Sequence, residues 1–518
     1  MAGSLAALGD GLRYCHDRNT MKVQQFLEHH GLSQNPFSQE DAQTDPLFKQ
    51  YCAKDVFHPA WDKIFGAADE PATAVVFGEK GSGKTALRLQ IVDQTAEHNR
   101  QHPERRVFVI EYDDFNPFLD CFHERMKLFG TNPERSLARF RLWDHMDAIL
   151  SLGVTKLVSD ILDEHSDGVI GPFEVQGDRL VKLSRPQKRD LLLLAAYYDH
   201  SLSLSPGERW SQLRRKMRYF NFKAYWDLAL GAVGTLTLGG LIFQYGNWSQ
   251  FASWWPWLVL IVLWGPWLIR QGQLLWHAWN LSRQIKVIDH PINPLRSILS
   301  RFERKDLIGQ PAPSRDRSDD RYELITKWQS ILKSLGFTSI TVLVDRVDEP
   351  HLINGSAQRM RDFLWPMFDN KFLKHAGIGF KLLLPIEVSF YLAKEDKEFY
   401  ERSRLDKQNL IRSLEWTGES LYDLANDRLR AVSTGNTAQV KLSQWFDPAI
   451  QEAELISTLA RLRVPRHLFK FIHRLLVEHC NRFTESNPQW TISRETLHAA
   501  MAVYLRDLEA YDRGMGTG

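Results

Sequence analysis

The feature that most constrains this chain is a glycine-rich segment placed between a strand and a helix. Gly78–Thr85 reads GEKGSGKT and matches GxxxxGK[ST] at every fixed position. It follows Thr73–Phe77 (TAVVF), a β-branched apolar run typical of a buried strand, and it precedes the helix-like stretch ALRLQIVDQTAEH. This order predicts a phosphate-binding loop in an α/β core with a parallel sheet. The alternative is a glycine-rich turn that arose by chance.

Each residue type in this segment has a chemical reason. Glycines let backbone N–H groups surround phosphate oxygens, and the helix N-terminus favours an anion. Lys84 is expected to bridge the β- and γ-phosphates, and Thr85 to offer its hydroxyl to Mg²⁺. ATP and Mg²⁺ are therefore the predicted cofactors. The predicted nucleotide-binding residues of the loop are Gly78, Gly81, Ser82, Gly83, Lys84 and Thr85.

A second motif carries carboxylates at the end of another buried strand. Ser339–Pro350 reads SITVLVDRVDEP, and the apolar run Ile340–Val344 ends at Asp345. A carboxylate in this position, beside a phosphate loop, holds Mg²⁺, usually through water, so Asp345 is the predicted metal-side residue. Glu349 is the first choice to orient or deprotonate the attacking water, and Asp348 is the second. The alternative is an ordinary exposed acidic strand end.

Two uncharged runs predict a membrane hairpin. Leu228–Phe243 and Phe251–Ile269 contain no charged residue, and nine of the chain's 17 tryptophans lie between positions 226 and 279. A helix needs about 20 apolar residues to cross the hydrocarbon core. We therefore predict transmembrane helices at 224–244 and 251–269, joined by YGNWSQ. A re-entrant or peripheral hairpin and the buried core of a soluble protein are the alternatives.

The basic residues predict how this hairpin is oriented. The connector has none, whereas both flanks are basic, so the positive-inside rule places both flanks in the cytosol. The N-terminus lacks the features of a signal peptide. We predict a two-pass inner (cell) membrane protein with cytoplasmic N- and C-terminal regions and lipid as a partner. The 65 basic and 63 acidic residues give no direct nucleic-acid signal. The flanking basic residues are Arg209, Arg214, Arg215, Lys216, Arg218 and Lys223 before the hairpin and Arg270, Arg283 and Lys286 after it.

The order of the motifs resembles a known family. About 260 residues separate Lys84 from Asp345, and both apolar runs lie in this gap, which we interpret as an insertion. A P-loop NTPase with an even number of membrane helices between its nucleotide motifs resembles the KAP family, in Gly78–Thr85 and in Val342–Glu349 (VLVDRVDE). KAP proteins typically continue this strand as Asp-Asp-Leu-Asp-Arg, whereas Asp-Arg-Val-Asp-Glu here is closer to the STAND signalling NTPases. The resemblance covers roughly residues 35–480.

The resemblance implies a function. Such proteins are membrane-bound NTPases that act on the cytosolic face and switch as oligomers; many are bacterial, and some exclude phage. We therefore predict an ATPase that acts as a homo-oligomer in bacterial anti-phage defence, with a protein partner from the same operon. An ATP-driven transport or channel component remains an alternative, as does a nucleotide-binding membrane scaffold with little turnover.

Three arginines complete the predicted site. Arg402 and Arg404 follow the predicted strand Phe380–Val388, where an arginine finger of this broad class reaches a neighbour's γ-phosphate. Arg466, after Pro465, resembles the sensor arginine of a C-terminal helical bundle. The alternatives are solvated surface charges for the first two, and an ordinary arginine at a helix start for the third.

The predicted fold is α/β: a three-layer P-loop NTPase core with a parallel sheet, a helical insertion carrying a two-helix transmembrane hairpin, and a C-terminal helical bundle. A further strand is predicted at Val107–Tyr112, and we expect it beside the phosphate-loop strand. The predicted segments are an N-terminal helical lead-in and strap at 1–46, the first part of the NTPase core at 47–118, the insertion at 119–310, the second part of the core at 311–404, and the bundle at 405–518.

Overall fold

The computed structural model describes most of the chain as two compact units. The first unit contains the described parts of Met1–Trp61, Gly78–Gln90 and Ser413–Gly518, and the second contains those of Asp62–Phe77 and Ile91–Arg412. Much of the predicted lead-in (1–19), the hairpin connector (245–250) and the start of the second apolar run (251–252) lie outside the described residues. The structure describes residues 20–52, 57–127, 133–162, 177–201, 204–244, 253–307, 309–313, 316–434 and 440–512.

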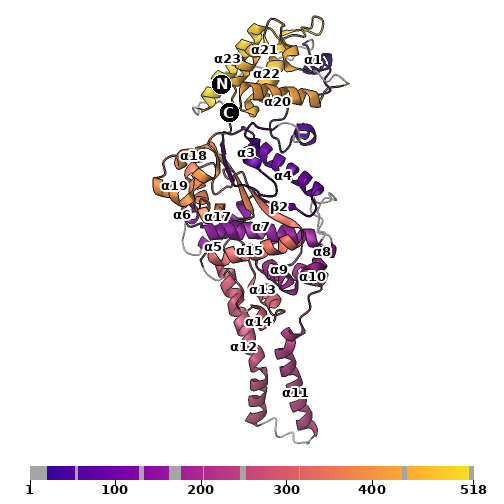
Figure 1. Cartoon of the computed structure of the whole chain (residues 1–518), viewed down its shortest axis with the longest axis vertical. Coiled ribbons are helices and arrows are strands. Elements are labelled where there is room, and N and C mark those ends of the chain that lie inside the picture. The colour runs from indigo at the N-terminus through magenta and orange to yellow at the C-terminus, as the bar shows by residue number, and fades with distance from the viewer. Residues whose placement is uncertain are drawn as a thin grey trace, which may run out of the picture. The chain divides into compact units, whose positions relative to one another are not determined.

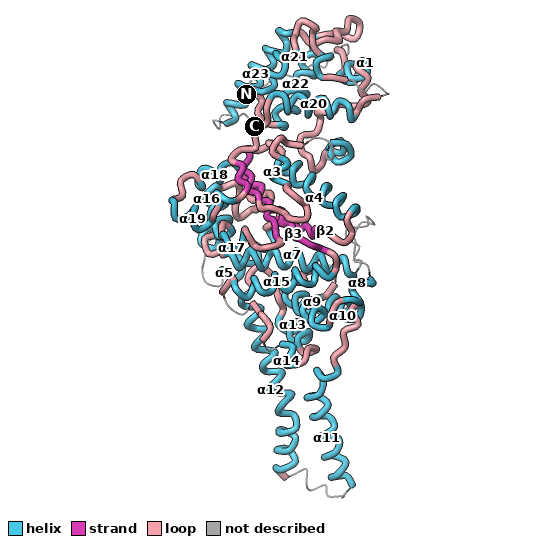
Figure 2. Tube along the Cα trace, viewed as in Figure 1, coloured by secondary structure: helices cyan, strands magenta, loops and turns pink. Residues whose placement is uncertain are grey.

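The second unit is built on a five-stranded parallel sheet, which confirms the predicted α/β class (Figure 2). The strand order is β2-β3-β4-β1-β5. Every residue of β1 and β4 is buried, as expected for a parallel sheet whose two faces are both covered. The strands are β1 Ala74–Gly78, β2 Arg106–Tyr112, β3 Phe337–Val344, β4 Ile378–Pro385 and β5 Asn409–Ile411.

The expected place of β2 in this sheet is wrong. β2 pairs with β3, from Val107 opposite Ser339 to Tyr112 opposite Val344, and β3 and β4 separate it from β1. Parallel strands are joined by long crossovers, which can pass over other strands, so chain order does not determine sheet order.

Two further details differ from the sequence expectation. The predicted strand Phe380–Val388 ends at Pro385, and helix α18 (Ile386–Leu392) begins at the next residue. Proline has no N–H for a strand ladder but is compatible with the start of a helix. Asn409–Ile411 was not predicted as a strand, yet it forms β5 and pairs with β1.

Helices surround the sheet of the second unit. α7 packs on β2 and α15 packs on β3 (Figure 1). Gly153 of α7 leaves room for the Trp328 indole of α15. Helix α4 (Lys84–Gln101) begins in the first unit and continues into the second. The other helices are α3 Trp61–Phe65, α5 Asn116–Lys127, α6 Pro133–Leu137, α7 Leu142–Leu162, α8 Gly177–Lys182, α9 Arg185–Tyr198, α10 Pro206–Lys216, η2 Phe222–Tyr225, α13 Ile292–Leu299, α14 Arg304–Leu307, α15 Asp319–Ser334, α16 Ala357–Leu364, η4 Trp365–Met367, α17 Asn370–Leu373, α19 Lys397–Ser403 and η5 Leu405–Lys407.

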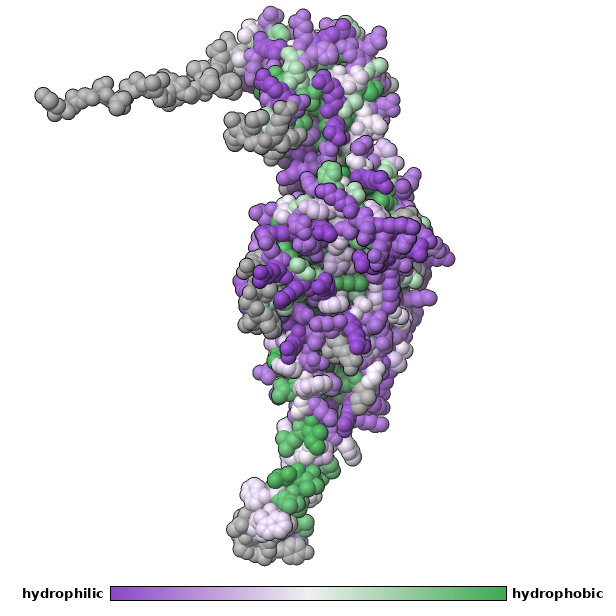
Figure 3. Space-filling model, turned by 90° about the vertical axis from the view of Figure 1, so that its left-hand side faces the viewer, coloured by the Kyte–Doolittle hydropathy of each residue, from purple (hydrophilic) through white to green (hydrophobic). Residues whose placement is uncertain are grey.

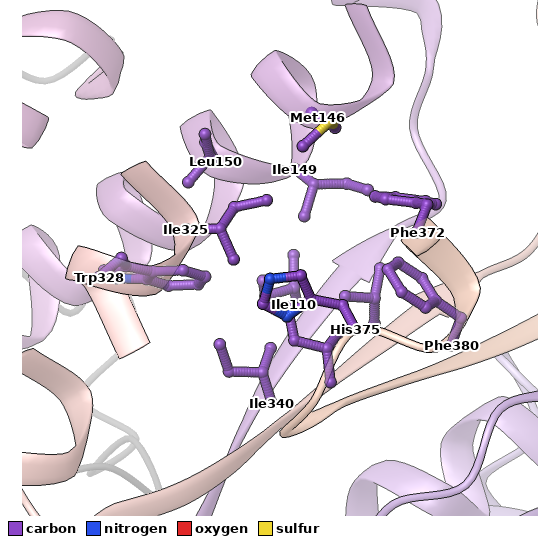
Figure 4. A pocket seen from close by; sticks show the side chains of 12 residues that line it. Ile110, Met146, Ile149, Leu150, Ile325, Trp328, Ile340, Phe372, His375 and Phe380 are labelled. Atoms are coloured by element: carbon purple, nitrogen blue, oxygen red, sulfur yellow. The ribbon is translucent and has the colours of Figure 1, made fainter. Parts of the chain in front are cut away.

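A small apolar cavity lies between the sheet and these helices. Its volume is about 10 Å³, and side chains such as Ile110, Ile149, Trp328 and Phe380 point into it (Figure 4). This is the size of a single water molecule, and a cavity with an apolar lining stays dry. We interpret it as a packing gap and not as a binding site.

A buried ion pair holds three helices of the second unit together. Arg321 Nη2 lies 2.9 Å from Asp147 Oδ2, and both side chains are fully buried. The Tyr198 hydroxyl donates to Asp147 Oδ1 at 2.8 Å. These contacts join α7, α9 and α15.

The hairpin predicted from the uncharged runs is present as two helices that pack side by side (Figure 1). These are α11 (Trp226–Gln244) and α12 (Trp254–Gln284), and both are long and apolar enough to cross a membrane. Only 11% and 6% of their most apolar stretches are buried, which is unlike the core helices of a soluble protein. On the visible face of this part of the chain, apolar residues (green) alternate with residues of intermediate hydropathy (Figure 3).

Arg270 fixes the base of this hairpin. It donates to the carbonyl groups of Ser300 and Phe302 at 3.0 and 2.7 Å, and to Asp227 Oδ2 at 3.2 Å. Asp227, the acidic residue at the start of α11, is therefore paired. Nearer the far end, Gly231 and Gly234 allow Trp264 and Leu263 of α12 to approach α11 closely.

The first unit is helical in its described part. Its core gathers around Trp445, Phe26 and Leu468. Arg428 of α20 donates to Asp45 and to the carbonyl group of Pro36, so the segment predicted as a strap is tied to a helix of this unit. Its elements are α1 Val23–His29, η1 Phe48–Cys52, α20 Gly418–Ala431, η6 Leu442–Trp445, α21 Glu452–Ala460, α22 Pro465–Arg482 and α23 Arg494–Asp512.

A buried lysine lies in the central strand β4. Lys381 is 1% exposed, and its Nζ donates to the carbonyl groups of Ile64, Phe65 and Ala72 at 2.6, 2.9 and 2.6 Å. Burial lowers the pKa of Lys381 to about 8. The ammonium binds the last carbonyl groups of α3, where a positive charge is favourable.

Replacing Arg321 by Met should leave the Asp147 carboxylate buried without its partner. We expect a loss of about 3–5 kcal/mol in the free energy of unfolding. The double variant Asp147→Leu/Arg321→Met should recover most of this loss, because no buried charge remains. Denaturant unfolding of the purified protein in detergent measures both variants. Equal destabilisation in the single and double variants would contradict this account.

The lowered pKa of Lys381 predicts a pH dependence of stability. Between pH 8 and about 10.4, the unfolded chain binds a proton at Lys381 that the folded chain has released, so stability rises with pH in this window. Lys381→Met removes this contribution. We expect the stability of the wild type relative to Lys381→Met to increase by about 2 kcal/mol across the window. An unchanged difference between the two proteins at pH 8 and pH 10 would show that burial does not perturb this lysine.

Candidate functional site

The glycine-rich segment joins a strand to a helix, as its flanking sequence predicts. β1 ends at Gly78 and α4 begins at Lys84, so the loop leads from a buried strand into a helix N-terminus. Gly81 and Gly83 have φ angles of +90° and +98°, in the left-handed region that favours glycine. A Cβ on Gly78 would collide with Ser82 Oγ. The backbone of the loop therefore requires glycine at 81 and 83, whereas a Cβ at position 78 would require the Ser82 hydroxyl to move.

Two polar side chains of the loop are directed to its interior. Lys84 Nζ donates to the carbonyl groups of Gly78 and Glu79 at 2.8 and 3.0 Å, so the ammonium lies against the loop that precedes it. Ser82 is fully buried, and its Oγ has no hydrogen-bond partner among the residues that the structure describes. A buried hydroxyl without a partner fits a loop whose polar groups serve an anionic ligand. Thr85 follows in the first turn of α4.

Two residues from the C-terminal segment hold this loop. Trp416 Nε1 donates to the carbonyl group of Ser82 at 2.8 Å. The backbone N–H of Arg466 donates to the carbonyl group of Gly81 at 3.3 Å. Arg466 is the second residue of α22, so this bond satisfies one of the N–H groups that every helix start leaves unpaired. The loop conformation is therefore coupled to the start of α22.

The Arg466 side chain is directed to Glu40. Its Nε lies 4.0 Å from Glu40 Oε2, and Lys470 Nζ lies 3.2 Å from the same oxygen. The predicted sensor residue thus reaches the loop through its backbone, and its guanidinium faces Glu40. The sequence analysis missed Trp416, which lies 334 residues from Ser82, and no spacing rule connects two such positions.

The acidic motif places its carboxylates in different surroundings. Asp345 follows the last residue of β3 and is 1% exposed, whereas the Glu349 side chain is 59% exposed. Arg346, between them, has a φ angle of +59°, which is strained for a residue with a side chain. Its Nε lies 3.7 Å from Glu349 Oε1. Asp348 is partly buried, and its carbonyl group accepts the N–H of Gly355 at 2.9 Å.

A third acidic position emerges from the strand register. Tyr112, the last residue of β2, lies opposite Val344, the last residue of β3. Asp113 and Asp345 are therefore the next residues of two neighbouring parallel strands, at the same edge of the sheet. The sequence analysis recognised this strand but assigned no role to Asp113. Its position beside Asp345 could be inferred only after the pairing of β2 with β3 was known.

The order of the strands also determines where β1, the strand that precedes the glycine-rich loop, lies in the sheet. After β1 the chain crosses to β2, whereas after β4 it crosses to β5 on the other side of β1. Connections that leave in opposite directions from neighbouring strands create the crevice in which open α/β sheets bind ligands. β1, whose last residue is Gly78, and β3, which precedes Asp345, end at this same edge because the sheet is parallel.

The remaining predicted residues lie elsewhere in the second unit. Arg402 is in α19, with its guanidinium 5.6 Å from the centre of the Phe399 ring, and Arg404 follows this helix with a φ angle of +51°. Both side chains are exposed.

Within the described residues, no group of three or more His, Cys, Asp and Glu side chains is arranged to hold a metal ion. A Mg²⁺ site would therefore depend on few protein ligands, on phosphate and on water.

The close approach of Gly81 and Arg466 gives a matched test. A Cβ on Gly81 would lie 2.5 Å from the Arg466 Cβ, whereas a Cβ on Gly31, with a similar φ of +71°, would meet nothing within 4 Å. Gly31→Ala should cost about 1 kcal/mol for the backbone alone, and Gly81→Ala should cost about 1–3 kcal/mol more. Thermal unfolding measures the difference. Equal losses would show that α22 does not constrain the loop.

The chain matches no model of a known protein family, no curated protein and no solved structure. The resemblance to the KAP family therefore rests on the two motifs and on the two apolar helices between them, and it remains an expectation. What these residues do has to be argued from their own chemistry and from their positions in the fold.

Proposed function

We propose that this chain is a membrane-anchored ATPase whose glycine-rich loop, Gly78–Thr85, binds the phosphates of ATP. The observation that carries the proposal is the path of this loop, from the end of a buried parallel strand into a helix N-terminus, with two glycines at positive φ. Backbone N–H groups in such a loop and the dipole of the following helix both attract a phosphate.

The roles of the other residues follow from phosphoryl-transfer chemistry. Lys84, now bonded to the carbonyl groups of Gly78 and Glu79, is proposed to turn its ammonium to the β- and γ-phosphates. Thr85 and Asp345 are proposed to hold Mg²⁺, which neutralises phosphate charge when bound. Glu349 is proposed to orient the attacking water, with Asp348 as the second candidate.

The contacts of the loop support a switching role. Gly81 and Ser82 offer their carbonyl groups to the Arg466 N–H and the Trp416 indole. If phosphate binding moves these carbonyl groups, the start of α22 and the segment before α20 must adjust. The exposed guanidinium groups of Arg402 and Arg404 are available to a neighbouring copy, in line with the proposed homo-oligomer.

The two apolar helices support a membrane location. α11 and α12 have the required length, and most of their surface is not covered by the rest of the chain. Asp227 is paired with Arg270 at the base of the hairpin, so it does not mark an ion route, and we favour anchoring over transport. Both flanks are proposed to face the cytosol. Anti-phage defence and a partner from the same operon remain proposals that rest on the family resemblance.

The proposal is tested by ATP hydrolysis with the purified full-length protein in detergent. Lys84→Ala should lower the rate of phosphate release at least about 100-fold, because the ammonium acts on charge that develops in the transition state. Lys80→Ala is the matched control, since it removes the same charge from an exposed, non-motif position of the same loop. Glu349→Gln should lower hydrolysis but leave ATP binding intact. Equal activity of Lys84→Ala and Lys80→Ala would overturn the proposal.

A further inference from the structure

A second, much larger cavity lies at the base of the hairpin, within the second unit. Its volume is about 990 Å³, which is in the range of small-ligand sites. The part of α12 that follows the uncharged run forms one wall. The ends of α13 and α14, residues 309–312, Tyr197 of α9 and Asp320 of α15 form the rest. Leu274 and Leu299 give it apolar surface. Its main polar residues are Arg270, Gln273, His277, Asn280, Arg304 and Gln310.

The position of this cavity along α12 indicates its depth relative to the membrane surface. The uncharged run ends at Ile269, and a bilayer adds about 5–7 Å of headgroup region beyond each side of its hydrocarbon core. At about 1.5 Å per residue, the turn that begins at Arg270 lies in this headgroup region. The cavity therefore begins at headgroup level and continues to the cytosolic side.

Exposed tryptophans support the same placement. Trp276 and Trp279 are 59% and 46% exposed, although they lie beyond the uncharged run. Tryptophan is enriched at the membrane–water interface. Together with Trp254 at the other end of α12, these residues span about 38 Å, close to the 40–45 Å of a bilayer with its headgroups.

One lining arginine remains to meet an anion. Arg270 and Arg304 line the cavity, together with one acidic residue, Asp320. Arg270 is already paired with Asp227 and is held in place by the carbonyl groups of Ser300 and Phe302. Arg304 is exposed, and among the described residues it has no ion-pair partner. Amide and imidazole groups from α12 add hydrogen-bonding capacity beside these charges.

We propose that this cavity binds the headgroup of an anionic phospholipid from the leaflet next to the second unit. The guanidinium, amide and imidazole groups of the lining suit a phosphodiester and its polar substituent, and the leucines and Trp276 suit the glycerol and the first acyl carbons. Basic pockets beside membrane helices on the cytosolic side recognise lipids of this class. The inference rests on the proposed membrane location and does not depend on ATP hydrolysis.

Two glycines on α12 provide a matched pair of variants. A Cβ on Gly272, which lines the cavity, or on Gly265, seven residues earlier on the same helix, would meet nothing within 4 Å. Gly272→Leu should fill the cavity without a clash, whereas Gly265→Leu adds the same side chain within the apolar run. A second pair consists of Arg304→Gln, in the cavity wall, and Lys305→Gln, which removes a neighbouring charge outside it.

The test measures lipid retained by the full-length protein in detergent, by native mass spectrometry, after addition of phosphatidylglycerol or phosphatidylethanolamine. We expect the wild type to prefer phosphatidylglycerol, and Gly272→Leu and Arg304→Gln to lose this retention about fivefold or more, the factor expected for one interfacial arginine. Gly265→Leu and Lys305→Gln should behave as the wild type. Equal retention of both lipids, or no difference within each pair of variants, would overturn the proposal.

Two further measurements separate the sources of failure. Glycerol 3-phosphate in solution, at the concentration of the lipid, should not displace phosphatidylglycerol; displacement would assign the cavity to a soluble phosphate and overturn the lipid proposal. Lys84→Ala, which tests the ATPase, should retain lipid as the wild type does. Lipid retention that is lost in Lys84→Ala but not in Gly272→Leu would also contradict the proposed site.

Discussion

The structure of the second unit depends on one constraint, the parallel pairing of all five strands. Parallel strands end at the same edge, so β1, β2 and β3 deliver Gly78, Asp113 and Asp345 to that edge although these residues are far apart in the chain. Parallel strands also need long crossovers, which here are helices that cover the sheet. The position of the acidic residues and the helical content thus have a common cause.

The same constraint explains where the hairpin can be inserted. β2 ends at Tyr112 and β3 begins at Phe337, so a long helical connection joins two strands that are direct neighbours. The entropic cost of a longer connection grows slowly with its length, and both of its ends remain fixed by the pairing of β2 with β3. The hairpin therefore lies in a crossover at the edge of the sheet and leaves the connection after β1, which forms the glycine-rich loop, unchanged.

Local features of this protein could be predicted from the sequence, whereas long-range ones could not. The loop between β1 and α4 follows from eight residues, because the glycine positions and the helix start are determined locally. The order of the strands could not be predicted, because the sequence of a long crossover does not indicate which strands the crossover passes over. β5 has three residues and no pattern of its own. Trp416 and Ser82 are far apart in the sequence, and their hydrogen bond forms only when the chain folds. Asp113 can be placed beside Asp345 only when the register of β2 with β3 is known.

Continuity of packing connects the hairpin to the sheet edge. α12 is one helix from Trp254 to Gln284, and Arg270 binds its middle to the end of α13 and to Asp227 at the start of α11. α13 packs on α9 and α10, α9 packs on α7 and α15, and these last two cover β2 and β3. The buried ion pair between Arg321 and Asp147 holds α15 rigidly against α7, because separating these helices would leave a charge in an apolar core. Close-packed elements of this kind transmit a displacement instead of absorbing it. A change at the carboxyl ends of β2 and β3 would therefore reach α12 through contacts that are already in place.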